Sequence, residues 1–90
     1  LDLLNNVPPT PEQIRLIARA ANAEGDVGNA HFYMGEYYLT IGNGPLAINQ
    51  LLMALESPDV NLVGRARIQA RLEQIIEMMP EDQRRRQREN

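Results

Sequence analysis

The segment 30–58 constrains the fold of this chain more than any other stretch. Its small and large apolar residues recur at helical spacing on both sides of a central Gly-Asn-Gly-Pro break. Small residues let two helix backbones approach closely, and large ones fill the space between neighbouring helices. Two such helices cannot bury all of their apolar faces alone, so the segment predicts one unit of a helical repeat array. The small residues are Gly35, Ala47 and Ala54, and the large ones are Met34, Tyr38, Ile48, Leu51 and Leu55.

The composition favours an all-α fold. With 90 residues, one Phe, three Tyr and no Trp, the chain must build its core from Leu, Ile, Met and Ala. β-branched residues are scattered, and no stretch alternates between apolar and polar with period two for long. We therefore expect a single small helical domain without a sheet.

Charge and cysteine content exclude several classes of function. A net charge of −3 is unlike the basic face of a nucleic-acid binder. The absence of cysteine excludes disulfides, thiolate metal sites and a cysteine nucleophile. No apolar run is long enough to span a membrane, and the N-terminal residues do not resemble a signal peptide. The chain opens mid-pattern without an initiator Met, so we expect it to be a fragment of a longer protein.

Prolines and glycines divide the chain into about four helices. Thr10, Pro11 and Gln13 form a helix start, with Thr10 as the N-cap and Gln13 completing a capping box. Gly25 and Gly42 lie 17 residues apart and are expected to end two successive helices. We predict antiparallel helix-turn-helix repeats with helices over residues 11–24, 27–41 and 45–56, and from residue 60 or 61 to residue 79.

The expected helices divide the chain into three parts. Residues 1–10 are expected to hold the end of a preceding helix and a linker, because Leu1, Leu3 and Leu4 precede a Val-Pro-Pro stop. Residues 11–79 form the helical domain, whose last helix caps the array. The apolar stripe of that helix is Ile68, Leu72, Ile75 and Met79. Residues 80–90 carry no apolar side chain after Pro80, and we expect a disordered or frayed tail.

The pattern resembles a tetratricopeptide repeat (TPR). Met34, Gly35 and Tyr38 match the first helix of that motif, and Gly42 matches its turn. Two positions depart from it, because His31 replaces a tryptophan and Gly44 replaces an aromatic residue. In the second helix the matching residues are Ala47, Leu51, Ala54 and Leu55, followed by Pro58. The resemblance implies a superhelix whose first helices line a concave surface.

A closer resemblance covers about two thirds of the chain. Segment 16–55 and the run at residues 65–75 are similar to the C-terminal end of bacterial periplasmic zinc metalloproteases of the β-barrel assembly-enhancing protease group. Gly35 and the turn at residues 43–45 depart from that group. The resemblance implies a periplasmic parent protein with zinc in an upstream His-Glu-x-x-His helix. It implies no cofactor and no metal site in this chain.

Histidine and arginine side chains are the first candidates for a site. His31 is the single histidine, so no zinc helix can form, and we expect packing or hydrogen bonding at a helix interface. Arg65, Arg67 and Arg71 form a basic patch on the last helix. Pairing with Glu73 and Glu77 on the same helix is the expected outcome, and an anion or acidic-partner site is the alternative.

The second candidate is a groove on the helix at residues 27–41. Phe32, Tyr33, Tyr37 and Tyr38 hold all of the aromatic content. Tyr38 is expected to pack between helices, whereas Tyr33 and Tyr37 either pack similarly or form a groove wall. Polar neighbours on that face could grip a peptide. The predicted partner-binding groove is Asn29, Tyr33, Glu36, Tyr37 and Thr40.

No catalytic constellation is present, so this chain is not expected to be an enzyme by itself. The favoured function is a protein–protein interaction module, the C-terminal TPR segment of a larger zinc metalloprotease, which recruits proteins or peptides. The alternative is a structural cap of a helical solenoid that packs on a catalytic domain and has no ligand. Weak self-association through an apolar face at Leu1, Leu3 and Leu4 is a third hypothesis.

Overall fold

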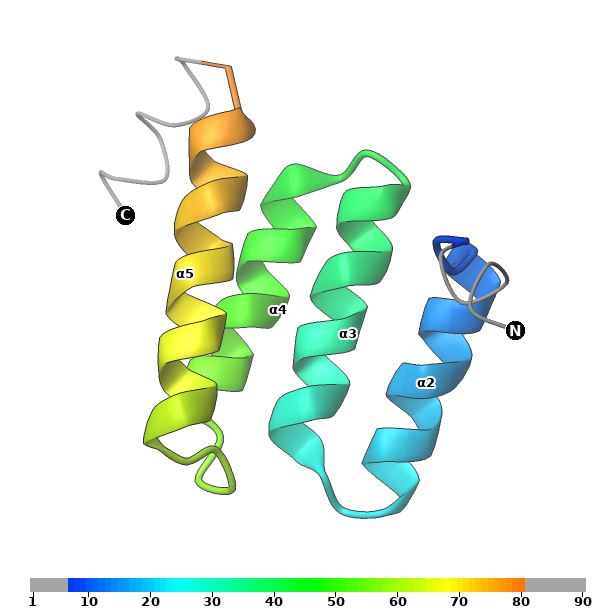
Figure 1. Ribbon diagram of the computed structural model, residues 1–90, viewed down its shortest axis with the longest axis vertical. Helices are drawn as coiled ribbons and strands as arrows, with labels where there is room; N and C mark the ends of the chain where they lie inside the picture. The colour runs from blue at the N-terminus through cyan, green and yellow to red at the C-terminus, as the bar shows by residue number, and fades with distance from the viewer. Residues whose placement is uncertain (1–6, 81–90) are drawn as a thin grey trace.

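A computed structural model describes residues 7–80 of the chain, and Figure 1 labels its helices. The described residues form four α-helices and no strand: α2 (Pro11–Ala23), α3 (Val27–Thr40), α4 (Gly44–Glu56) and α5 (Leu62–Met78). Each lies within two residues of its predicted bounds, so the all-α prediction is confirmed. The helix end predicted at residues 1–6 and the tail predicted at residues 81–90 lie outside the described residues.

The helix ends follow from local sequence. Thr10 accepts a hydrogen bond from the Gln13 backbone N–H, and the Gln13 side chain accepts one from the Thr10 backbone, which confirms the capping box. Gly25 and Gly42 adopt φ angles of +82° and +85°, a region that glycine enters without strain, and both follow helix ends as predicted. The helix α4 begins one residue before Pro45 because the Asn43 side chain caps it.

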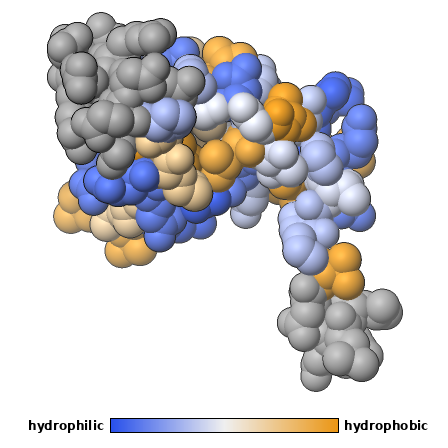
Figure 2. All heavy atoms as spheres, turned by 90° about the horizontal axis from the view of Figure 1, so that it is seen from above, coloured by the Kyte–Doolittle hydropathy of each residue, from blue (hydrophilic) through white to orange (hydrophobic). Residues whose placement is uncertain are grey.

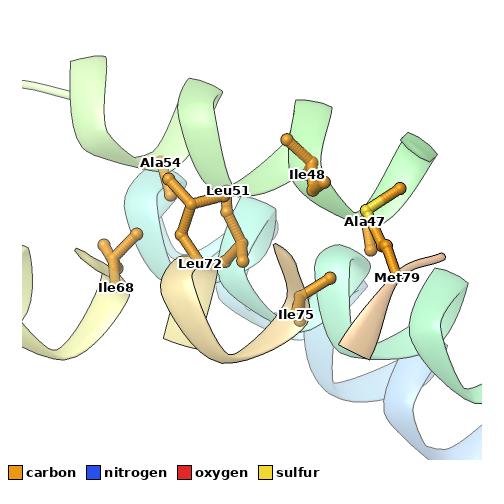
Figure 3. Packing of buried hydrophobic residues seen from close by; sticks show 8 residues of the cluster. All are labelled: Ala47, Ile48, Leu51, Ala54, Ile68, Leu72, Ile75 and Met79. Atoms are coloured by element: carbon orange, nitrogen blue, oxygen red, sulfur yellow. The ribbon is translucent and has the colours of Figure 1, made fainter. Parts of the chain in front are cut away.

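Successive helices run antiparallel and lie side by side from α2 to α5 (Figure 1). Helix α3 packs against both α2 and α4, and α4 packs against α5. The main buried cluster lies between α4 and α5, whose apolar side chains point toward one another in Figure 3. It consists of Ala47, Ile48, Leu51 and Ala54 on α4, and Ile68, Leu72, Ile75 and Met79, the predicted stripe, on α5 or at its C-cap.

Glycine permits the close approach of α3 to its neighbours. Gly35 is buried, and a Cβ atom there would lie 3.3 Å from both the Ala47 carbonyl oxygen and Leu51 Cγ. The small-residue prediction for this helix pair is therefore confirmed. Gly28 is a second close approach that the sequence reasoning missed, because a Cβ atom there would overlap the Val60 side chain.

Ile17 and Ile41 are large apolar residues that stay largely exposed. Ile17 on α2 is 42% exposed because it lines an open cavity between α2 and α3. Ile41 is 51% exposed because it is the C-cap of α3, beyond the last turn that packs against α2. The remaining α2 stripe is anchored by Ile14 and Ala18, which are buried.

Candidate functional site

The candidate site lies where α3 faces α5. We call this surface the inner face and define it by Asn29, Phe32, Tyr33 and Glu36 on α3 with Arg67 and Arg71 on α5. Residues three, four and seven apart share one side of a helix, which is why these α3 residues align. Arg67 and Arg71 are four residues apart and reach the same line of side chains from the opposite helix.

A bidentate ion pair joins the two helices. The Arg71 guanidinium donates from Nε to Glu36 Oε2 at 2.6 Å and from an Nη atom to Glu36 Oε1 at 2.9 Å. The side chains are only 29% and 22% exposed, so the pair is partly shielded from water. The hydrogen bonds to the Glu36 carboxylate raise the pKa of Arg71 further above its ordinary value, so Arg71 stays charged.

The Arg67 guanidinium contacts α3 one to two turns before Glu36, at Asn29 and Phe32. It donates to Asn29 Oδ1 at 2.7 Å and lies 4.3 Å from the centroid of the Phe32 ring, a cation–π contact. The Asn29 amide in turn donates to the Asp26 carboxylate. The predicted groove residues Asn29 and Glu36 therefore both bind arginines of α5.

These contacts correct the predicted pairing of the α5 arginines within their own helix. Arg67 and Arg71 reach across to α3, and Arg65 donates to the Leu55 carbonyl oxygen at 2.7 Å. Glu73 instead accepts a long hydrogen bond from Gln69. Arg67 and Arg71 bind α3 rather than residues of their own helix because α3 places the Asn29 amide and the Glu36 carboxylate opposite their guanidinium groups.

Tyr33 lies in the wall of an apolar cavity of about 350 Å³. The cavity opens between α2 and α3, and the Glu36–Arg71 pair lies at its edge. Its other lining residues are Pro9, Ile14, Ile17 and Phe32. Over the part of the surface drawn in colour in Figure 2, apolar side chains are interspersed with polar ones and form no single large patch. This cavity is therefore the concave apolar feature closest to the predicted groove.

The other two predicted groove residues lie apart from this cavity. The Tyr37 ring packs edge-on against Tyr38 and lies 5.6 Å from the Arg15 guanidinium of α2. Thr40 is exposed and donates to the Glu36 carbonyl oxygen of its own helix at 2.8 Å. The structure thus brings Asn29, Tyr33 and Glu36 together, whereas Tyr37 faces α2 and Thr40 ends the helix.

Asp59 caps α3 from a distant part of the chain. Asp26 occupies the N-cap position of α3, but its side chain makes no capping hydrogen bond. Both Asp59 carboxylate oxygens instead accept from the Gly28 backbone N–H at 3.2 Å, and Ser57 Oγ donates to the same carboxylate. The hydrogen bonds from Ser57 and Gly28 lower the pKa of Asp59 below its ordinary value of 3.8.

His31 lies between α3 and α4. Its Nδ1 atom is 2.8 Å from Gln50 Oε1 and the side chain is half-buried, which confirms the predicted role at a helix interface. Within residues 7–80, no group of three or more His, Asp or Glu side chains could hold a metal ion. In the same range, no helix has the length and apolar character needed to cross a membrane.

Sequence reasoning missed Arg67, Arg71 and Asp59 as partners of α3. The signal for the arginines was their spacing of four residues, which matches the spacing of Phe32 and Glu36 along the facing helix. Asp59 gave a weaker signal, because a Ser-Pro-Asp run reads as a helix end. Comparison with protein-family models, curated proteins and solved structures finds no match to this chain.

Proposed function

We propose that this chain is a protein–protein interaction module built from TPR-like helix pairs, and that its inner face binds a protein or peptide segment. The observation that carries the proposal is the open apolar cavity walled by Ile17, Phe32 and Tyr33 beside the Glu36–Arg71 pair. An aromatic wall supplies contact area at small entropic cost, and adjacent charged groups can orient a peptide backbone.

A partner for this surface needs two properties. It must present an apolar side chain that fits a cavity of about 350 Å³, which has room for one or two large side chains. It must also carry hydrogen-bonding groups beside that side chain, because the cavity edge is the Glu36–Arg71 pair. A peptide segment with an exposed Leu, Met or Phe meets both requirements.

The alternative function, a structural cap without a ligand, is favoured by a different observation. Asn29 and Glu36 already bind Arg67 and Arg71, so these polar groups hold α5 in place. Gln69 and Glu73 are exposed along the middle of α5, as polar residues of a terminal repeat are, although Leu62, Val63 and Met78 are exposed at the ends of the same helix. Both functions can coexist in one domain, because the cavity lies on the α2 side of α3.

The test is selection of binding peptides from a random display library on the 90-residue chain. We expect enriched peptides with an apolar anchor and a Kd in the micromolar range, on the order of 1–100 μM. Tyr33→Ala should weaken binding at least about tenfold, the loss typical of a central aromatic contact. Leu52→Ala on α4 is the matched control, because Leu52 is an exposed apolar residue outside this cavity.

Two results would favour the structural cap instead. Either no peptide is enriched, or Tyr33→Ala and Leu52→Ala weaken binding of the enriched peptides equally. Circular dichroism of each variant must show unchanged helix content, so that loss of binding is not loss of fold.

We also propose that the parent protein is a bacterial periplasmic zinc metalloprotease. The similarity of segments 16–55 and 65–75 to the C-terminal end of that group supports this proposal. Zinc and peptidase activity would then belong to the upstream domain. Determining the sequence upstream of Leu1 tests it: a His-Glu-x-x-His helix supports the protease, and a different upstream domain overturns it.

A further inference from the structure

A second cavity lies on the side of α3 away from the inner face. It has a volume of about 320 Å³ and opens where α2, α3 and α4 lie side by side (Figure 1). Because successive residues of a helix are rotated by about 100°, the α3 residues of this cavity lie on the opposite side of that helix from Phe32 and Glu36. We call it the rear cavity and define it by Arg19 and Asn22 on α2, Ala30, His31 and Met34 on α3, and Gln50 on α4.

The rear cavity has an apolar floor and a polar rim. Ala18 and Ala30 are buried and Met34 is half-buried, so these three side chains form the floor. Arg19 and Asn22 are exposed, and their spacing of three residues places them on one side of α2. No aspartate or glutamate among residues 7–80 lines the cavity, although acidic residues outnumber arginines in that range. The rear cavity is therefore a locally cationic hollow on an acidic chain.

Arg19 has no partner among residues 7–80, whereas each of the other four arginines in that range has one. It makes no hydrogen bond, ion pair or ring contact with a described residue. A guanidinium carries five N–H donors, so Arg19 presents an uncompensated charge and a complete set of donors to a ligand. The partners of the other arginines are the Tyr37 ring for Arg15, the Leu55 carbonyl oxygen for Arg65, Asn29 for Arg67 and Glu36 for Arg71.

The contact between His31 and Gln50 orients a second donor. The His31 Nδ1 atom lies 2.8 Å from Gln50 Oε1, and because an amide oxygen only accepts, the imidazole donates from Nδ1. The amide NH₂ of Gln50 is then left to donate elsewhere, and it has no partner in the described part of the chain. The rear cavity thus combines a guanidinium with an amide donor that a hydrogen bond between two helices holds in place.

We propose that the rear cavity binds the carboxylate of a glutamate side chain presented by a protein partner. A guanidinium forms bidentate, charge-assisted hydrogen bonds to a carboxylate, so Arg19 binds both oxygens and the Gln50 amide donates a further hydrogen bond. The methylene groups of the glutamate lie on the apolar floor, which favours a carboxylate on a short hydrocarbon chain over a phosphate. The exposed rim on α2 is accessible to a folded partner.

This second binding surface does not depend on the proposed function. The rear cavity and the cavity beside the inner face share no lining residue, and they lie on different sides of α3. The two sites also differ in chemistry, because the first takes an apolar side chain and the second takes an acidic one. A failure of one proposal therefore leaves the other standing.

The test is a titration of the full 90-residue chain, followed by amide chemical shifts, with the capped tripeptide acetyl-Ala-Glu-Ala-amide. We expect saturable shifts at Arg19, Asn22 and Gln50, with a Kd on the order of 1–10 mM because the probe is only a fragment of a partner. The neutral peptide acetyl-Ala-Gln-Ala-amide has nearly the same shape. It should bind at least about fivefold more weakly, because it lacks the charge that strengthens the hydrogen bonds.

Arg19→Gln should raise the Kd of the Glu peptide at least about fivefold, because it removes the bidentate donor. Arg15→Gln is the matched control. It removes the same charge from the same helix, but Arg15 lies on the Tyr37 ring and outside the rear cavity, so the Kd should change by less than about twofold. Unchanged far-UV circular dichroism of both variants shows that a loss of binding is not a loss of fold.

Four results would overturn the proposal. Equal weakening by Arg15→Gln and Arg19→Gln would assign the binding to the overall charge of α2. Shifts concentrated at Phe32 and Tyr33 would assign the peptide to the inner face. Butyrate that binds as tightly as the Glu peptide would identify a small organic acid, rather than a side chain of a partner, as the occupant. Absence of saturable shifts with the Glu peptide would exclude carboxylate binding.

Discussion

At the scale of single residues, two glycines and one aspartate determine how α3 contacts its neighbours. Gly35 leaves room for the Ala47 carbonyl and for Leu51, and Gly28 leaves room for Val60. Asp59 replaces the nearby Asp26 as the cap of α3. Each contact joins parts of the chain far apart in sequence, so these residues fix how the helices stack.

Gly35→Leu is predicted to destabilise the fold. The added side chain must enter a contact where even a Cβ atom lies 3.3 Å from its neighbours, and overpacking of this kind costs about 1–3 kcal/mol. Thermal unfolding measures the change. Ala66→Leu adds bulk at an exposed position of α5 and should stay within about 0.5 kcal/mol. A higher melting temperature for Gly35→Leu than for the unsubstituted chain would mean that Gly35 does not lie in a helix contact.

The lowered pKa of Asp59 predicts that the free energy of unfolding decreases in acid. Because the folded chain holds the pKa of Asp59 below 3.8, the ionised carboxylate stabilises the fold above pH 3.8, and this stabilisation disappears as the pH falls through the lowered pKa. Asp59→Asn should therefore make the unfolding free energy fall less steeply between about pH 5 and about pH 2. Ser57→Ala removes the largest cause of the lowered pKa and should move the acid loss to higher pH. Parallel pH profiles for Asp59→Asn and the unsubstituted chain would contradict the capping role.

At the scale of helices, polar side chains orient α5 against α3 while apolar ones bury it against α4. The buried stripe of α5 packs on α4 (Figure 3), and the Glu36–Arg71 and Asn29–Arg67 contacts face α3. A stripe of Ile and Leu permits several rotations of a helix about its axis. The two arginine contacts select one of them.

A double-mutant cycle on Glu36 and Arg71 tests this orientation. The pair is bidentate and partly shielded, so we expect a coupling free energy of about 0.5–1 kcal/mol, the upper part of the range for surface pairs after solvent screening. The coupling should shrink at high salt. Urea unfolding of both single variants and of the double variant measures it. Glu73→Ala is the control, since Glu73 makes only a long hydrogen bond to Gln69. Strict additivity for Glu36→Ala and Arg71→Ala would show that the pair does not hold α5.

The helices and their ends could be predicted from the sequence because their signals are local. The Thr10 capping box and the Gly25 and Gly42 turns act over three or four residues, and the Ile68–Leu72–Ile75 stripe follows one helix. The candidate site was harder to predict because its contacts join different helices. Periodicity places Asn29 and Glu36 on one face of α3, but it does not show that Arg67 and Arg71 lie opposite them.

At the scale of the whole molecule, the two ends of the helix row differ. Helix α5 exposes Leu62, Val63 and Met78 at its two ends, whereas α2 exposes Leu16 and Ile17 in its middle. The inner face and its cavity lie between these two helices, where side chains of α2, α3 and α5 meet.

The central claim is that the inner face binds a peptide segment, and its most direct test maps the amide chemical shifts of the chain during titration with a library-selected peptide. The account predicts saturable shifts concentrated at Phe32, Tyr33 and Glu36 on α3, at Arg67 and Arg71 on α5, and at Ile17 on α2. Shifts concentrated instead on the exposed side of α4 around Leu52 and Met53, or no saturable shifts at all, would contradict it.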